Sequence, residues 1–385
     1  SQWAFAAALI LPQSILLGTT FPPMTSGVLR IDPGLPGAKL SMLYFLNSIG
    51  AVAGVLASGF LLIPIVGLPG VLLAPDARSG GNGSALVRVI HVGLAAVTID
   101  VYVTAPDDNL DDFGPNFGGV GSGQTTIGLR LSPGTYRVRG AISGSKVVIY
   151  DSGTVELVEN TSINLLFYTL QSASLLQCMV LPVSGSGAGA VVATNQVSAL
   201  KVVNAALNAG TIDGFFDGTQ FVDDVPFAAA TTYAFQTVGA HTLTFEATST
   251  AGAAIASLQQ TLESTSDISV LVVGFPGAVQ AIAFADDNLV PLAGACRVRF
   301  VNASSDNAAY DVYVGDTKQV SALAARSASE YVTLVPATYT FTFRDPASGA
   351  TVLAVADQAI GEGRVATLYL AGAVGQLSSI VSTDR

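Results

Sequence analysis

Arg88-Val89-Ile90-His91, followed nine residues after its histidine by Asp100-Val101-Tyr102-Val103, is a stretch that the chain contains in three versions. The other two are Lys201-Val202-Val203-Asn204 with Asp213-Gly214-Phe215-Phe216, and Arg299-Phe300-Val301-Asn302 with Asp311-Val312-Tyr313-Val314. In each version the basic residue precedes the aspartate by twelve positions (88 to 100, 201 to 213, 299 to 311). Such fixed spacing is the signature of an internal repeat, so three copies of one domain are expected.

Hydrophobic alternation within the repeats indicates β-strands. Tyr136-Arg137-Val138-Arg139 and Tyr339-Thr340-Phe341-Thr342-Phe343 both alternate side chains of different polarity. A period of two means a strand with one buried face. The fold class is therefore predicted as mainly β, with three tandem antiparallel immunoglobulin-like sandwiches of about seven strands each.

A second landmark supports this register. Pro133-Gly134-Thr135-Tyr136 corresponds to Val238-Gly239-Ala240-His241 and to Pro336-Ala337-Thr338-Tyr339. It follows the aspartate by 25 positions in the second and third repeats, and by 33 in the first (213 to 238, 311 to 336, 100 to 133). The first repeat therefore has eight extra residues (33 − 25), near the acidic run at 107–115.

Polar, glycine-rich segments mark the domain boundaries. The predicted division is an apolar segment at 1–75, a linker at 76–84, a first sandwich at 85–184, a linker at 185–197, a second sandwich at 198–290 and a third at 296–385. Linkers of this composition are flexible as isolated peptides.

The apolar segment at 1–75 is the least charged part of the chain. It has no charged residue before Arg30 and none between Lys39 and Asp76. A membrane-spanning helix needs roughly 20 consecutive apolar residues, and both runs approach or exceed that length. We expect an α-helical hairpin, with a helix at 40–67, that contacts a membrane through residues 1–70 or packs in a core shared with other copies of the chain.

Two family resemblances follow from these motifs. Residues 10–70 resemble a membrane-helix hairpin of fused transporter-like/spermidine synthase proteins, through the segments at 11–22 and 43–51. The catalytic domain of that family does not follow, so the resemblance implies an anchor and no aminopropyl transfer. Residues 85–385 resemble three tandem copies of the bacterial secreted domain-of-unknown-function family 4397, through Val87–His91, Asp100–Val103 and Pro133–Tyr136, and the second copy departs at Gly214 and Val238. That resemblance implies an extracellular or cell-envelope protein without an established activity.

The repeated polar residues are interpreted as structural. Asp100, Asp213 and Asp311 recur at one strand position, where we expect them to accept hydrogen bonds from loop amides or from the side chains of His91, Asn204 and Asn302. The two histidines, His91 and His241, belong to different repeats, which argues against a paired zinc site or a catalytic triad.

Two further sets of residues leave alternatives open. Asp107, Asp108, Asp111 and Asp112 offer carboxylates of the kind that calcium binds, although an exposed acidic turn is the simpler interpretation. Cys178 and Cys296, the only cysteines, either form a disulfide or remain free thiols.

Charge and composition limit the function. The net charge is −11 and no Lys/Arg cluster exists, so nucleic acid is excluded as a partner. No catalytic constellation and no cofactor motif is present, and the expected protein is not an enzyme. The prediction is a non-catalytic extracellular or cell-envelope structural or adhesive protein that self-associates, such as a surface-filament subunit anchored through its apolar N-terminus. The alternative is a membrane-anchored glycan- or ligand-binding accessory protein that uses Phe113, Phe117, Tyr168 and Phe221.

Overall fold

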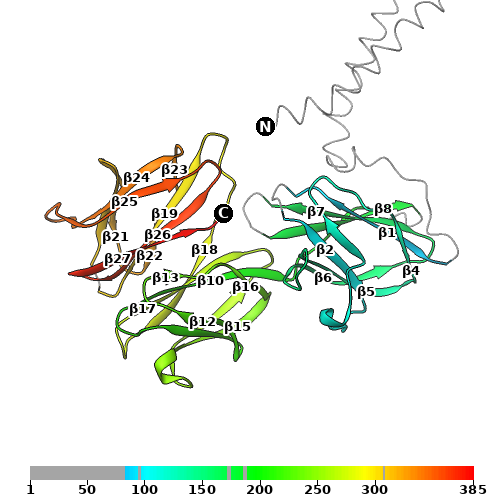
Figure 1. The fold of residues 1–385 in the computed structure, drawn as a ribbon, viewed down its shortest axis with the longest axis horizontal. Coiled ribbons are helices and arrows are strands. Elements are labelled where there is room, and N and C mark those ends of the chain that lie inside the picture. Colours follow the sequence, from blue (N-terminus) through cyan, green and yellow to red (C-terminus); the bar gives the residue numbers. More distant parts are fainter. Residues whose placement is uncertain (1–82, 94–96, 171–174, 185–188, 307) are drawn as a thin grey trace, which may run out of the picture. The chain divides into compact units, whose positions relative to one another are not determined.

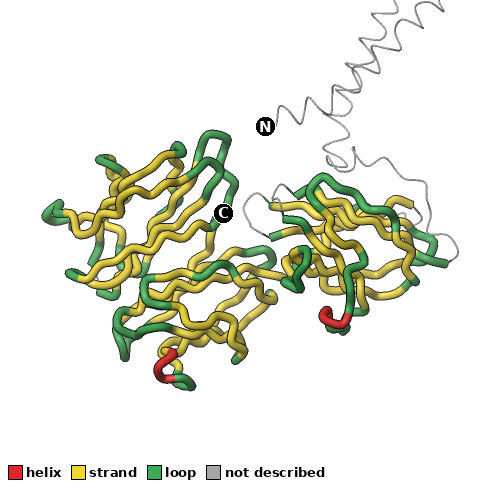
Figure 2. The backbone as a smooth tube through the Cα atoms, in the orientation of Figure 1, coloured by secondary structure: helices red, strands yellow, loops and turns green. Residues whose placement is uncertain are grey.

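The computed structural model describes residues 83–93, 97–170, 175–184, 189–306 and 308–385 (Figure 1). The chain divides into two units, Ser1–Asp76 and Ala77–Arg385, and every described residue belongs to the second. The predicted helical hairpin at 1–75 therefore lies outside the described residues. Where the chain is described it is mainly β, with two short 3-10 turns, η2 (Leu110–Asp112) and η3 (Thr248–Thr250) (Figure 2). No helix among these residues is long and apolar enough to cross a membrane.

The strands form six sheets, which fall into three pairs that follow the three repeats. Sandwich 1 contains β1 (Ala85–His91), β2 (Ile99–Thr104), β3 (Phe117–Val120), β4 (Leu129–Leu131), β5 (Gly134–Ile142), β6 (Val148–Leu157), β7 (Ser162–Thr169), β8 (Leu176–Ser184) and β9 (Val191–Ala193). Its sheets have the orders β4-β1-β7-β8-β9 and β3-β2-β5-β6.

The other two sandwiches repeat this arrangement. Sandwich 2 contains β10 (Val197–Ala206), β11 (Ile212–Phe216), β12 (Thr219–Val225), β13 (Ala229–Ala230), β14 (Ala234–Thr237), β15 (Gly239–Ala247), β16 (Ala254–Leu262), β17 (Asp267–Gly274) and β18 (Gln280–Asp286). Sandwich 3 contains β19 (Cys296–Ser304), β20 (Tyr310–Val314), β21 (Thr317–Leu323), β22 (Ser327–Ala328), β23 (Val332–Leu334), β24 (Ala337–Arg344), β25 (Thr351–Ile360), β26 (Val365–Ala373) and β27 (Gln376–Thr383).

One strand pair in each sandwich is parallel, and the prediction of purely antiparallel sheets is wrong there. The pairs are β1 with β7, β10 with β17 and β19 with β26. The physical reason is the crossover: the chain leaves the first strand, builds the opposite sheet, and returns beside that strand in the same direction. These central strands are buried on both faces, as in β10, where every residue is buried.

Each sandwich has its own apolar core between its two sheets. A fourth apolar cluster lies between sandwiches 2 and 3 and is built from equivalent positions of both. Val203 and Leu271 of sandwich 2 meet Val301 and Tyr369 of sandwich 3, and all four are fully buried. The two sandwiches therefore pack their β10–β17 and β19–β26 sheets against each other.

The predicted linker at 185–197 is structured over the part that the structure describes, which begins at 189. Strand β9 pairs with β8, and Asn195 is fully buried beside it. The Asn195 amide group donates to the carbonyls of Ile149 (3.0 Å) and Leu176 (2.8 Å), and its oxygen accepts from the amides of Asp151 and Val197 (3.0 Å each). These bonds fasten the junction to sandwich 1, because a buried amide side chain substitutes for a missing strand neighbour.

Candidate functional site

The three repeated aspartates hold β-bulges. The Oδ1 atoms of Asp100, Asp213 and Asp311 accept from the backbone amides of Gly119 (2.7 Å), Asp224 (2.8 Å) and Ala322 (2.8 Å). Each donor has a positive φ, between 46° and 64°. The strand register shifts near each of them. The carboxylate thus satisfies an amide that the bulge removes from the ladder.

The surroundings of the three aspartates differ in charge. Burial raises the pKa of Asp100, but the amides of Gly144 and Gly119 lower it further, so its pKa lies below the usual value. The Lys318 ammonium and the Ala322 amide lower the pKa of Asp311. In all three sandwiches an amide of the neighbouring strand donates to the aspartate, whereas the side chains at 91, 204 and 302 form their hydrogen bonds elsewhere.

His91, Asn204 and Asn302 instead close the loop that follows the first strand of each sandwich. Asn204 donates to the Gly210 carbonyl (2.9 Å) and accepts from the Ala206 amide (3.0 Å), and Asn302 does the same with Ala308 and Ser304. In sandwich 1 the His91 imidazole bonds to the equivalent backbone groups. Its Nδ1 accepts a hydrogen bond from the Gly93 amide (3.1 Å), and its Nε2 bonds to the Val97 carbonyl oxygen (3.0 Å).

Gly93 makes room for this larger ring. A Cβ at position 93 would lie 2.7 Å from Cε1 of His91, whereas the equivalent positions 206 and 304, beside asparagines, are alanine and serine. The pair His91 and Gly93 is therefore a steric alternative to asparagine with a larger neighbour.

Substitution of His91 by asparagine is accordingly expected to preserve the loop, whereas alanine leaves the Gly93 amide and Val97 carbonyl without their partner. We expect His91→Ala to lower the free energy of unfolding by about 1–3 kcal/mol, and His91→Asn to recover most of that loss. Urea unfolding of both variants measures the difference. Equal losses for alanine and asparagine would contradict the assignment.

The acidic insert of sandwich 1 is an ordered loop held by basic side chains. Arg137, Arg139 and Lys146 donate to the carbonyls of Pro106 (3.4 Å), Asp108 (3.0 Å) and Leu110 (2.8 Å). The calcium candidates Asp107, Asp108, Asp111 and Asp112 do not bring three carboxylates together. Within the described residues only Asp213, Asp223 and Asp224 do so, with ligand atoms within 4.8 Å of one another. Asp213 already accepts a hydrogen bond from the backbone amide of Asp224, and we assign no metal to these three carboxylates.

Both cysteines are buried free thiols in the structure. Cys178 lies in the core of sandwich 1 and Cys296 in that of sandwich 3, so their side chains belong to different domains. Burial raises the pKa of the Cys178 thiol, which makes it an unreactive core residue.

The most highly charged buried site lies between sandwiches 2 and 3, and we call Lys201, Asp286, Arg299 and Asp384 the interdomain cluster. Lys201 forms an ion pair with Asp384, and Arg299 forms one with Asp286. Each basic residue therefore pairs with the aspartate of the other sandwich. The four side chains are at most 3% exposed. Lys201 Nζ also lies 3.8 Å from Asp286 Oδ2.

The cluster is built from equivalent positions of the two repeats. Lys201 lies beside Ser269 in the β10–β17 ladder, and Arg299 beside Thr367 in the β19–β26 ladder. Each hydroxyl donates to the aspartate of its own sandwich at 2.6 Å, Ser269 to Asp286 and Thr367 to Asp384. Asp286 is the last residue of β18 and Asp384 directly follows β27, and each lies 85 residues after the basic residue of its sandwich (201 to 286, 299 to 384).

Tyrosines enclose the charges. Lys201 Nζ lies 5.0 Å from the ring centre of Tyr233, and the Arg299 guanidinium lies 5.0 Å from that of Tyr331. The Tyr233 hydroxyl also donates to Asp286 at 2.5 Å. Burial lowers the pKa of Lys201, but Tyr369 and the two carboxylates raise it, and the net pKa is above the usual value. At rest the cluster thus holds a charged ammonium and guanidinium against two carboxylates.

Sequence reasoning identified Lys201 and Arg299 as repeat markers but missed Asp286 and Asp384. The equal spacing of 85 residues was the available signal. Strand β8, which takes the place of β18 and β27 in sandwich 1, contains no acidic residue.

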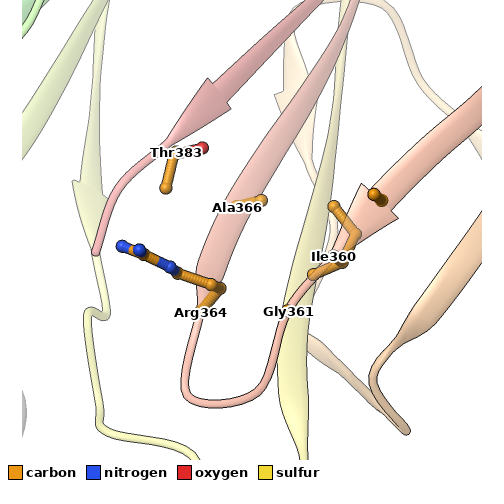
Figure 3. Close-up of a pocket in the computed structure, with 6 residues that line it drawn as sticks. Ile360, Gly361, Arg364, Ala366 and Thr383 are labelled. Carbon is orange, nitrogen blue, oxygen red and sulfur yellow. The ribbon is translucent and has the colours of Figure 1, made fainter.

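The surface of sandwich 3 is hollowed at one place. A shallow depression of about 300 Å³ opens on sandwich 3, lined by Ala359, Ile360, Gly361, Arg364, Ala366 and Thr383 (Figure 3). Its lining contains one charged side chain and no acid–base pair. Of the four aromatic residues suggested for glycan binding, Phe117 is buried, Phe221 packs on the core of sandwich 2, and Tyr168 is half-buried. Phe113 is 41% exposed, and these four aromatic side chains do not form one exposed platform.

Comparisons with known proteins support the repeat. The model of a family described as a domain of unknown function, DUF4397, matches residues 198–309 and 297–385, which contain sandwiches 2 and 3. The resemblance of sandwich 1 to this family, and that of residues 10–70 to a membrane hairpin, stay predictions. No curated protein matches the chain.

Solved structures with some similarity include the C-terminal domain of AlgF from P. aeruginosa (21% identity, 23% of this chain and 98% of that chain, TM-score 0.20). A second is the TIE protein of Bacillus anthracis, with 10% identity over 77% of this chain and 51% of that chain and a TM-score of 0.16. A third is a family CBM26 protein from Eubacterium rectale in complex with maltoheptaose, with 10% identity over 53% of this chain and 96% of that chain and a TM-score of 0.17. TM-scores this low carry no argument about function.

Proposed function

We propose that this chain is a non-catalytic structural protein of the cell surface or envelope, in which β-sandwiches form a rigid display unit and the apolar residues 1–75 provide the anchor. The observation that carries the proposal is the interface between sandwiches 2 and 3. Domains of one chain normally move relative to each other unless their interface is extensive and apolar. Here an apolar cluster and two buried ion pairs join them.

Fixed orientation is useful to a protein that displays or spaces something and is unnecessary in a chain of independent binding modules. The junction before sandwich 2 is restrained as well, because β9 and Asn195 are bonded to sandwich 1. Self-association through residues 1–75 is part of the proposal, since such an apolar segment needs lipid or protein to cover it.

Surface labelling tests this proposal. Antibodies against residues 83–385 are expected to label intact cells that produce the full chain, and external protease is expected to abolish the label. An antibody against a cytoplasmic protein serves as the control for cell integrity. Labelling that appears only after permeabilisation would overturn the proposal.

A further inference from the structure

Lys201, Asp384 and Asp286 are arranged as a nucleophile, an electrophile and a proton relay, and we propose that Lys201 and Asp384 condense to an isopeptide bond between sandwiches 2 and 3. The inference goes beyond the proposed function and does not depend on it. It concerns a covalent modification that the chain performs on itself.

The two reacting groups already touch. Lys201 Nζ donates a hydrogen bond to Asp384 Oδ1, and the two side chains are 1% and 0% exposed. The residues come from strand β10 and from the position directly after β27, 183 residues apart in sequence. Enclosure by protein keeps water, which would compete in the reverse reaction, away from the pair.

Two hydroxyl groups hold the Asp384 carboxyl group. Thr367 Oγ1 donates to its Oδ2 at 2.6 Å, and Ser382 Oγ donates to its Oδ1 at 2.9 Å. Donors aimed at a carboxyl oxygen stabilise the negative charge that develops there when a nucleophile adds to the carbon. The electrophile is therefore both oriented and polarised.

Asp286 is placed to move the protons. Its Oδ2 lies 3.8 Å from Lys201 Nζ, and it is held by the hydroxyls of Ser269 (2.6 Å) and Tyr233 (2.5 Å). A lysine is a nucleophile only after it loses a proton, so the resting ammonium needs a neighbouring base. Asp286 is the second carboxylate beside that ammonium.

The reaction balances without an oxidant or cofactor. One proton of the ammonium passes by way of Asp286 to the Asp384 carboxylate, which makes a neutral amine and a neutral acid. The amine nitrogen attacks the Asp384 carboxyl carbon, and Asp286 transfers a second proton from nitrogen to the departing hydroxyl group. One C–N bond forms, one C–O bond breaks, and one water molecule leaves. The product removes one opposite pair of buried charges and leaves Asp286 paired with Arg299.

The equivalent position of sandwich 3 explains why one bond is expected rather than two. Arg299 occupies the place of Lys201 and pairs with Asp286, but a guanidinium remains protonated and is not a nucleophile. Lysine at 201 and arginine at 299 therefore give one reactive pair and one permanent ion pair.

Mass spectrometry of the denatured full chain tests the proposal. The expected mass is lower than that of the sequence by one water molecule. Because trypsin does not cleave after an acylated lysine, the digest is expected to contain residues 147–297 joined to residues 365–385. A chain with the mass of its sequence, cleaved after Lys201, would overturn the proposal.

Two variants locate the reaction. Lys201→Arg keeps the charge and removes the nucleophile, whereas Asp286→Asn keeps both reacting groups and removes the relay. Both are expected to have the full mass of their sequences, and a loss of water that persists in Lys201→Arg would place it elsewhere and refute the assignment. If either variant fails to fold, the wild-type digest still decides the question.

Discussion

Replacement of Asp286 by alanine is expected to lower the free energy of unfolding of sandwiches 2 and 3 by about 3–5 kcal/mol, the usual cost of breaking a buried ion pair from one side. The variant leaves the Arg299 guanidinium, 3% exposed, without its carboxylate, and two buried cations then share Asp384. Desolvation of the unpaired Arg299 charge accounts for this figure, and loss of the bond proposed between Lys201 and Asp384 would add to it. The measurement is urea unfolding followed by far-UV circular dichroism, because the one tryptophan lies at position 3.

The neighbouring residue provides a matched control. Asp287 pairs with Arg297 at 2.8 Å, but its side chain is 49% exposed. Asp287→Ala is expected to change stability by only about 0–1 kcal/mol, as exposed ion pairs do. If the two alanine variants unfold at the same urea concentration, the interdomain cluster does not stabilise the interface.

Substitution of Asn195 by alanine is the second change with a large expected effect. Four buried backbone groups lose their partner, namely the carbonyls of Ile149 and Leu176 and the amides of Asp151 and Val197. With partial repair by water, we expect a loss of about 2–4 kcal/mol. The loss should be local, so hydrogen exchange at the Asp151 and Val197 amides is expected to accelerate more than exchange in sandwich 3.

Thr194→Ala serves as the control for this prediction, because Thr194 is the exposed neighbour in the same segment. It should leave exchange at both amides unchanged. Uniform acceleration across all three sandwiches after Asn195→Ala would show that Asn195 does not act at the junction.

The repeat spacing was enough to predict three sandwiches. The twelve-residue interval between the basic residue of a buried strand and the aspartate recurs only if the same backbone fold recurs. Strand direction was not predictable in the same way. Alternation of side chains reports which face is buried, and it is identical for parallel and antiparallel neighbours. The pairing of β1 with β7 therefore appears only when the crossover is seen.

Only the basic half of the interdomain cluster could be predicted from the sequence. Lys201 and Arg299 were noticed as markers, but a basic residue in a strand is normally assigned to solvent, since lysine is almost never fully buried unless it is paired. Its partner lies in another domain, and Asp384 is 183 residues away. Local pattern cannot supply such a contact. For the acidic insert, likewise, the anchoring groups Arg137 and Arg139 come from β5, more than twenty residues downstream.

Because the two ion pairs are reciprocal, sandwiches 2 and 3 resemble the two subunits of a symmetric dimer joined in one polypeptide. In a two-fold symmetric dimer each subunit offers the same basic side chain and the same aspartate to its partner, as Lys201 and Asp286 meet Asp384 and Arg299 here. Tandem duplication of a gene for one self-associating sandwich would create this interface directly, with no new contact to evolve. After fusion the two halves no longer need to be identical, and position 201 can keep a lysine while position 299 holds an arginine.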